Sequence, residues 1–268
     1  MTPHGFEYYN AFIDEGGTIL PWNSDLEEMY EKRTYRNLVK TDDLVKFEVI
    51  VKETDLLVRA RRDLFQETRE SVLKYRQQIE TYIEANPEFQ RSFTPLKEDT
   101  FAPEIVREMI RTSGLARVGP MAAVAGALAE SVSKDLLKLS EEVIIENGGD
   151  IYLVTSQERT IGIYAGHSPL SLKIGITIGP EDSPLGVCTS SGTVGHSLSF
   201  GKADAVSVLS RSAALADAAA TAIGNIVKEK RDIEMALERG KEIEGVLGML
   251  IILGDKMGVW GNVRLIQL

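Results

Sequence analysis

The chain has 268 residues, enough for one large domain or two small ones with a sizeable core. Its 30 basic and 40 acidic residues give a net charge of -10, which argues against nucleic acid as the main partner, because phosphate backbones are bound by clusters of Lys and Arg. No apolar run is long enough for a transmembrane helix, so we expect no membrane partner. The single cysteine excludes an intramolecular disulfide. Together with the lack of a signal peptide, it favours a cytoplasmic location.

The hydrophobic periodicity predicts a mixture of strands and helices along the chain. Alternation predicts a strand pair at residues 45–52 and 56–60, and helical spacing predicts helices at 63–85 and 103–112. A segment of small residues follows, and then strands are predicted at 142–146, 151–155, 160–164, 172–178, 185–188 and 203–209. We expect an Ala-rich helix at 213–227, a charged helix at 232–239, and a closing hairpin formed by 245–253 and 259–268. Because strands and helices mix without strict alternation, the predicted fold class is α+β.

The most unusual stretch is the ten residues from Cys188 to Ser197, CTSSGTVGHS. It gathers five hydroxyls, two glycines, a thiol and an imidazole after a predicted strand. Hydroxyls and exposed backbone N–H groups suit a bound anion such as phosphate, and glycines allow close approach of the backbone. A polar turn between two strands is the alternative. Cys188 and His196 suggest a nucleophile and a base, although a lone Cys after an apolar strand is more often a buried small hydrophobe.

A second candidate feature is the pair Asp217 and Thr221 in the Ala-rich helix. Residues four apart lie on one face of a helix, and every residue between these two is Ala. A carboxylate and a hydroxyl are oxygen ligands of the type that Mg²⁺ accepts, with substrate phosphate completing the shell. The alternative is that Asp217 caps the helix or bonds Ser212, while Thr221 bonds its own helix.

Glycines mark two further segments. Asn147-Gly148-Gly149-Asp150 lets a ligand come near the backbone and supplies a carboxylate, but Asn-Gly is also a strong hairpin signal. Residues 119–129 are small on almost every face, so a helix there can lie close to a ligand or simply pack tightly on its neighbours.

In this order, the motifs resemble the ApbE family, the FAD:protein FMN transferases. The resemblance rests on the strand ending in Gly148-Gly149-Asp150, on the Thr-Ser segment at 188–192, and on the Ala-Asp-Ala-Ala-Ala-Thr-Ala helix at 216–222. The small segment 122–130 precedes them, as a glycine-containing helix does in that family. The matched region covers residues 119–225, and the whole chain is most similar to a shorter branch of ApbE-like proteins, a likeness that assigns no reaction.

The resemblance implies antiparallel sheets flanked by helices in a single domain over residues 1–268. Within it, residues 1–115 would be a divergent N-terminal part, 116–230 the motif-bearing core, and 231–268 a closing helix and hairpin. It also implies a bound flavin nucleotide, FAD or FMN, with Mg²⁺ held by Asp217 and Thr221. The residues expected to bind the nucleotide are Gly119, Met121, Gly126, Asn147, Gly148, Gly149, Asp150, Thr189, Ser190, Ser191, Gly192, Thr193 and Gly195.

The chain departs from the transferases in three places. Their His-x-x-Asp-Pro-x-Thr-Gly stretch is replaced by a short interval containing Phe200-Gly201-Lys202-Ala203-Asp204. Their Lys-Gly pair appears as Ala125-Gly126, and their N-terminal flavin-binding segment has no clear counterpart. His196 is the candidate replacement for the lost His as general base.

These features give a leading hypothesis and two alternatives. The first is a protein that binds a flavin or another nucleotide with Mg²⁺ and transfers FMN or a related phosphoryl-linked group to an acceptor protein. The second is a non-catalytic binding or assembly module, and the third is thiol chemistry at Cys188. A homo-oligomer is compatible with each of them.

Overall fold

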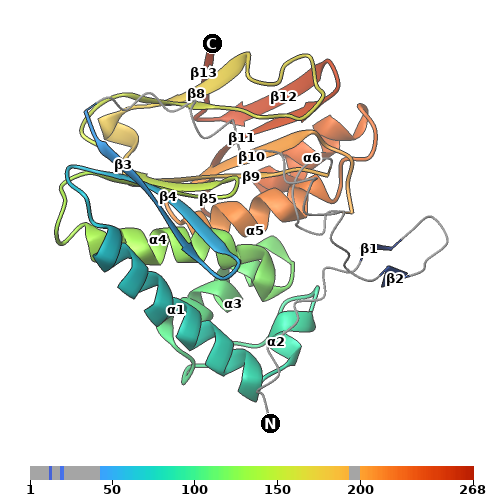
Figure 1. The fold of residues 1–268 in the computed structure, drawn as a ribbon. Coiled ribbons are helices and arrows are strands. Elements are labelled where there is room, and N and C mark those ends of the chain that lie inside the picture. The colour runs from blue at the N-terminus through green and yellow to red at the C-terminus, as the bar shows by residue number, and fades with distance from the viewer. Residues whose placement is uncertain (1–11, 14–18, 21–42, 193–199) are drawn as a thin grey trace. The chain divides into compact units, whose positions relative to one another are not determined.

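Figure 1 shows the computed structural model, which describes residues 12–13, 19–20, 43–192 and 200–268. The chain divides into two units, residues 1–37 and 38–268. In the first unit, strands β1 (Phe12–Ile13) and β2 (Ile19–Leu20) form an antiparallel pair. All other elements belong to the second unit. The single domain expected over the full length stays a prediction.

The second unit is built on an eight-stranded sheet in the order β12-β11-β10-β9-β6-β5-β4-β3, and every neighbouring pair is antiparallel. A separate three-stranded antiparallel sheet has the order β13-β8-β7. The strands are β3 (Val45–Val51), β4 (Thr54–Ala60), β5 (Val143–Asn147), β6 (Asp150–Val154), β7 (Arg159–Gly162), β8 (Ile174–Ile178), β9 (Leu185–Ser190), β10 (Ala205–Ser210), β11 (Val246–Leu253), β12 (Lys256–Gly261) and β13 (Arg264–Gln267).

Helices cover one face of the large sheet, and the small sheet lies over its other face (Figure 1). The helical elements are α1 (Phe65–Ala85), α2 (Glu88–Arg91), α3 (Glu104–Ala116), the 3₁₀ turn η3 (Pro120–Ala123), α4 (Val124–Leu136), the 3₁₀ turn η4 (Pro180–Asp182), α5 (Ala213–Gly224) and α6 (Asp232–Lys241). Strand β5 illustrates the layering, because Val143 and Ile145 belong to the core on the helix side while Ile144 belongs to the core under the small sheet. The α+β class with antiparallel sheets flanked by helices is therefore confirmed.

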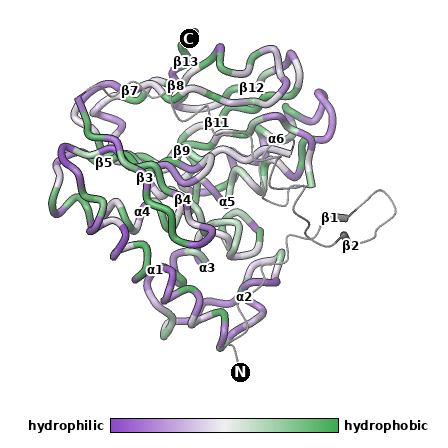
Figure 2. Tube along the Cα trace, in the orientation of Figure 1, coloured by the Kyte–Doolittle hydropathy of each residue, from purple (hydrophilic) through white to green (hydrophobic). Residues whose placement is uncertain are grey.

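Helix α1 forms because its apolar residues recur at helical spacing. Val72, Ile79 and Ile83 are buried, and the opposite face is charged. Figure 2 shows the resulting change between hydrophobic and hydrophilic residues along the helix. The helix ends at Ala85, ahead of Asn86 and Pro87, as the sequence predicts.

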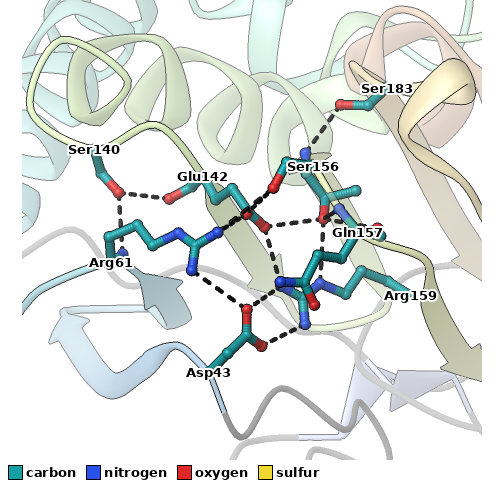
Figure 3. Close-up of polar contacts among 9 residues, drawn as sticks. Asp43, Arg61, Ser140, Glu142, Ser156, Gln157, Arg159 and Ser183 are labelled. Atoms are coloured by element: carbon teal, nitrogen blue, oxygen red, sulfur yellow. Dashed lines mark hydrogen bonds and ion pairs between the residues drawn. The ribbon is translucent and has the colours of Figure 1, made fainter.

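A cluster of ions closes the end of the large sheet where β4 ends and β5 begins (Figure 3). The guanidinium of Arg159 donates to both carboxylate oxygens of Asp43, at 2.6 and 2.8 Å, and to Glu142 at 3.0 Å. Arg61 also pairs with Glu142. Both Arg159 and Glu142 are almost fully buried. A buried charge is tolerated only when it is paired, so this cluster is a structural tie among four segments.

Two differences from the sequence prediction affect how the strands pair. Strand β9 continues to Ser190 because Cys188 and Ser190 pair with Val208 and Val206 of β10, so the polar stretch begins inside the sheet and not in a loop. The C-terminal hairpin is limited to β11 and β12. At Gly261 the backbone takes a φ of +77°, and the chain then continues into β13, which pairs with β8 of the small sheet.

No single helix in the described part of the chain is both long and apolar enough to span a membrane. Helix α3 and the η3–α4 segment pass that test only as a pair, with a bend of 103° between them.

Candidate functional site

The candidate site begins where α4 touches α5. The backbone N–H of Gly126 donates to Oδ2 of Asp217 at 2.9 Å. A Cβ at Gly126 would lie 2.2 Å from the carbonyl oxygen of Ala213 and 2.9 Å from Cβ of Asp217. Only glycine allows this approach, and the contact fixes the Asp217 carboxylate. The alternative that Asp217 caps its own helix is wrong, since the N-cap is Ser212.

Strands β6 and β9 bring two further candidates to the same place. Asp150 lies opposite Cys188 in the register of these strands. The Cys188 thiol is fully buried and donates to the Ala213 carbonyl at 3.3 Å. Gly186, two residues earlier, would place a Cβ 2.5 Å from Cα of Ala213, so the first turn of α5 rests directly on β9. Asp150, Cys188 and Asp217 therefore form one group from three elements.

The electrostatics of this group are unusual for half-buried carboxyls. Burial raises the pKa of Asp150 to about 7, and the charge of Glu146 acts in the same direction. Burial also raises the pKa of Asp217 well above its usual range, with the charge of Asp150 adding to it, while the N–H groups of Gly126 and Ala125 lower it. Burial and the two carboxyl charges raise the pKa of the Cys188 thiol. The surroundings of the three groups therefore favour their neutral forms.

The turn between β5 and β6 lines the same region. Asn147 pairs with Asp150 across a two-residue turn, and Gly148 has a φ of +71°, so the hairpin expected from Asn-Gly is present. The side-chain amide of Asn147 donates to the carbonyl of Ala125 at 3.2 Å, which ties the turn to the start of α4. Nothing lies within 4 Å of a Cβ built on Gly148, so this side of the turn is open.

The described part of the polar stretch extends the site along β9. The hydroxyls of Thr189 and Ser207 lie 2.8 Å apart, but on the face of the sheet that turns toward the small sheet, opposite to Cys188. The Ser190 hydroxyl would lie 3.6 Å from a Cβ at Gly224, near the end of α5. Gly192 donates to the Ala203 carbonyl at 2.9 Å. Ser191 follows β9 and is half-buried, whereas Thr193, Gly195 and His196 lie outside the described residues.

Two further predicted binding residues, Gly119 and Met121, lie in the segment that leads into α4 and packs against α5. A Cβ at Gly119 would come within 1.8 Å of the Ser92 carbonyl oxygen, so Gly119 serves the contact with the segment after α2. Met121 packs against the core cluster under α3. These contacts agree with the packing alternative for residues 119–129, and nucleotide binding by Gly119 and Met121 stays a prediction.

The sequence analysis missed Glu130 of α4. This buried carboxylate accepts the backbone N–H of Ala213 at 2.8 Å and the Ser212 hydroxyl at 3.1 Å, so it satisfies and stabilises the N-terminus of α5. The available signal was a lone acid after a run of small residues. Glu130 and Gly126 together hold α5, and hence Asp217 and Thr221, against α4.

The oxygen-bearing side chains of this group decide whether it can hold a divalent cation. Among the described residues, no three His, Cys, Asp or Glu side chains gather in a way that could hold a metal ion. Asp217 and Thr221 present two oxygens, both half-buried, on one face of α5. The charges acting on the Asp150 and Asp217 carboxyls are those of other carboxyls, and within the described ranges neither carboxyl forms an ion pair. Two oxygens are too few to hold a cation by themselves, so these residues fit Mg²⁺ only where a phosphate supplies further oxygen ligands.

Two cavities lie away from this group. One of about 250 Å³ lies between α1 and the end of α4, lined by Glu67, Glu70, Ser71, Lys74, Asp135, Leu136 and Leu139. The other, of about 260 Å³, is lined by Glu98, Asp99, Thr100, Glu104, Arg107, Glu108, Ile110 and Arg111. Both carry mixed charges, and neither includes a predicted site residue.

The fold is that of the ApbE flavin transferases. The Flavin Transferase ApbE from Vibrio cholerae superposes with a TM-score of 0.54 at 15% identity, covering 81% of this chain and 96% of that chain. The ApbE protein from Thermotoga maritima gives a TM-score of 0.53 at 13% identity, covering 80% and 96%. At these identities the likeness concerns the fold.

Sequence comparison identifies the family. The family model described as AbpE bacteria matches residues 36–265, and the chain belongs to this family. A UPF0280 protein of Methanocaldococcus jannaschii is 44% identical over 224 residues, which is 81% of this chain and 91% of the relative. A UPF0280 protein of Methanosarcina acetivorans is 43% identical over 197 residues, 73% of this chain and 78% of the relative. The ApbE-like resemblance drawn from the motifs is thereby confirmed.

Proposed function

We propose that this protein binds a flavin or another nucleotide together with Mg²⁺ at the group formed by Asp150, Cys188 and Asp217, and that it transfers FMN or a related phosphoryl-linked group. The observation that carries this proposal is the pair of half-buried carboxyls, Asp150 and Asp217, which repel each other and form no ion pair in the described part of the chain. A divalent cation would offset that repulsion. The fold shared with solved flavin transferases supports a flavin nucleotide as the ligand.

The roles of the chain's own residues follow from their places. Asp217 and Thr221 would hold the cation, and Gly126 would keep the Asp217 carboxylate in position through its N–H group. Ser190, Ser191 and Gly192 would bind phosphate oxygens at the end of β9, and Asn147 to Asp150 would form the opposite wall. When bound, Mg²⁺ would neutralise charge on the diphosphate oxygens.

The proposed reaction joins the FMN phosphorus of FAD to a hydroxyl oxygen of an acceptor protein. The bond broken is the P–O bond to AMP, which leaves, and a base takes the hydroxyl proton. His196 is the proposed base, on the family resemblance. The thiol of Cys188 is not proposed as a nucleophile in this reaction. Burial raises its pKa and keeps it protonated, and a protonated thiol is a weak nucleophile. We place this activity in the cytoplasm, where a free thiol persists.

The test is calorimetric titration of FAD with and without Mg²⁺, followed by incubation with candidate acceptor proteins and mass analysis for an added FMN. We expect Mg²⁺-dependent binding that Asp217→Asn and Thr221→Val weaken by tenfold or more, whereas Thr221→Ser, which keeps the hydroxyl, binds nearly as the wild type. Binding without transfer to any acceptor would favour the non-catalytic module. Nucleotide binding that is equal with and without Mg²⁺ and unaffected by Asp217→Asn would overturn the proposal.

A further inference from the structure

Two phenylalanine rings are exposed beside the candidate site. Phe93 follows α2 and is 64% exposed, and Phe200 precedes β10 and is 61% exposed. Their ring centroids lie 5.9 Å apart with an interplanar angle of 74°, an edge-to-face contact. A contiguous pair of exposed large apolar side chains is informative, because proteins commonly keep such surface for binding.

The backbone around Phe200 ties this ring to the candidate site. Its N–H donates to Oδ1 of Asn225 at 2.9 Å. Asp217, Thr221 and Asn225 are spaced four residues apart along α5 and its C-cap, so they lie on one side of the helix. Asn225 lies farther than Thr221 from Asp217 along the helix axis. A Cβ at Gly192 would lie 2.3 Å from the Gly201 carbonyl oxygen, which brings the residue after Phe200 against the polar stretch.

Glycine contacts hold the backbone beside both rings. A Cβ at Gly201 would lie 1.8 Å from the Gly224 carbonyl oxygen, so the chain beside Phe200 is pressed against the end of α5. A Cβ at Gly119 would lie 1.8 Å from the Ser92 carbonyl oxygen and 3.0 Å from Cα of Phe93. Close packing thus orders the backbone that carries each exposed ring before a ligand binds. The protein therefore loses less conformational entropy when a ligand stacks on the ring.

We propose that Phe93 and Phe200 form a stacking subsite for the planar ring of the nucleotide whose phosphates bind at Asp217 and Thr221. This inference rests on the proposed function. The shared chemistry is a flat heteroaromatic ring, either the isoalloxazine of a flavin or the adenine of an adenosine nucleotide. Stacking on an aromatic side chain discriminates little between such rings, so the subsite selects for the presence of a ring and its distance from the phosphates.

The test compares FAD, FMN, ADP and inorganic pyrophosphate, each titrated in the presence of Mg²⁺ against the wild type, Phe93→Ala and Phe200→Ala. We expect each variant to weaken the ring-bearing ligands by roughly five- to a hundredfold and to leave pyrophosphate binding within twofold. Loss with FMN but not ADP assigns the isoalloxazine, and loss with ADP but not FMN assigns the adenine. Phe93→Tyr keeps an aromatic ring and should bind the ring-bearing ligands nearly as the wild type does. The matched control is Phe101→Ala, because Phe101 is 98% exposed in the connector before α3.

A second readout uses Phe93→Trp, with Phe101→Trp beside it. A flavin ring stacked on an indole loses fluorescence, so quenching in the first variant alone supports an isoalloxazine at this subsite. Equal binding of all ring-bearing ligands by the wild type and both alanine variants would overturn the subsite while the Asp217 results still support the proposed function. Equal weakening of pyrophosphate and nucleotides by the alanine variants would also overturn the subsite. A wild type that binds no nucleotide would overturn both the subsite and the proposed function.

Discussion

Gly126 donates its backbone N–H to the carboxylate of Asp217, which lies 91 residues further along the chain. This bond joins the last motif helix to the small segment before the first motif strand. It places the Asp217 carboxylate beside Asp150, in surroundings that favour neutral acids. The group is thus assembled at a cost to the free energy of folding, which is common where a binding site is kept.

Gly126→Ala tests the close contact between α4 and α5. The added Cβ would meet the Ala213 carbonyl at 2.2 Å, so we expect a loss of about 1–3 kcal/mol in the free energy of unfolding, measured by urea titration. Gly114→Ala is the control, since Gly114 lies in α3 with nothing within 4 Å of its Cβ position, and it should gain up to about 1 kcal/mol. A neutral Gly126→Ala would contradict the packing.

Asp217→Asn should stabilise the cation-free protein. The change removes one of two repelling carboxyls and keeps an oxygen for the Gly126 N–H. We expect a gain of about 0.5–2 kcal/mol in the free energy of unfolding near pH 8 with chelator present, and a smaller gain with Mg²⁺. Asp232→Asn removes an exposed carboxylate that accepts two backbone N–H groups and should bring no gain. Destabilisation by Asp217→Asn in chelator would refute the repulsion.

Glu130→Gln tests how α5 is held. The substitution replaces the carboxylate that accepts the Ala213 N–H and the Ser212 hydroxyl, so the N-terminus of α5 loses a buried charge-assisted partner. We expect a loss of about 1–3 kcal/mol in the free energy of unfolding and weaker Mg²⁺ binding, measured by urea titration and calorimetry. Lys134→Met removes only the exposed partner of Glu130 and should cost less than about 1 kcal/mol. Equal effects of the two variants would argue against the capping role.

Cys188 should react slowly with thiol reagents. Its side chain is fully buried, and its thiol pKa is raised by burial and by the carboxyls of Asp150 and Asp217. Alkylation near neutral pH should proceed far more slowly in the native protein than in urea, as followed by mass spectrometry. Rapid native alkylation would instead support thiol chemistry at this position.

The ion cluster of Figure 3 predicts how stability depends on acid. Hydrogen bonds from Arg159 lower the pKa of Asp43 to about 2. Burial alone would raise the pKa of Glu142, but hydrogen bonds from Ser156, Arg159 and Thr155 outweigh it and lower the pKa to about 2. Because these pKa values lie below those of the unfolded chain, the stabilisation is present above about pH 4.5 and is lost as the pH falls toward 2.

Glu142→Gln measures that contribution. We expect a loss of about 1–3 kcal/mol at neutral pH, because the buried Arg159 loses one charged partner and keeps Asp43, and a flatter decline of the urea midpoint between pH 4.5 and 2. Glu238→Gln, at an exposed pair with Lys241, should change the profile by less than about 1 kcal/mol. A profile unchanged by Glu142→Gln would exclude the cluster as the source of the acid dependence.

Local features of the site were predictable from the sequence, and long-range ones were not. The turn at Gly148 and the helix carrying Asp217 follow from turn chemistry and helix propensity, which act over a few residues. The contact of Gly126 with Ala213 depends on how two helices approach each other, and a small residue alone does not reveal its neighbour. Glu130 looked like an ordinary surface acid, since its partner is the start of a helix 83 residues away.

The antiparallel pairing of β6 with β9 has a consequence for how the protein can be taken apart. This pairing joins two halves of the eight-stranded sheet: β3 to β6 form one half, and β9 to β12 form the other. Asp150 belongs to the first half, Cys188 belongs to the second, and Asp217 lies in α5, which packs on β9 and β10 of the second half, so neither half alone contains all three residues. A ligand that contacts both halves would oppose their separation. Amide hydrogens of β6 and β9 would then exchange more slowly when the ligand is bound, and this slowing would be larger than in the outer strands.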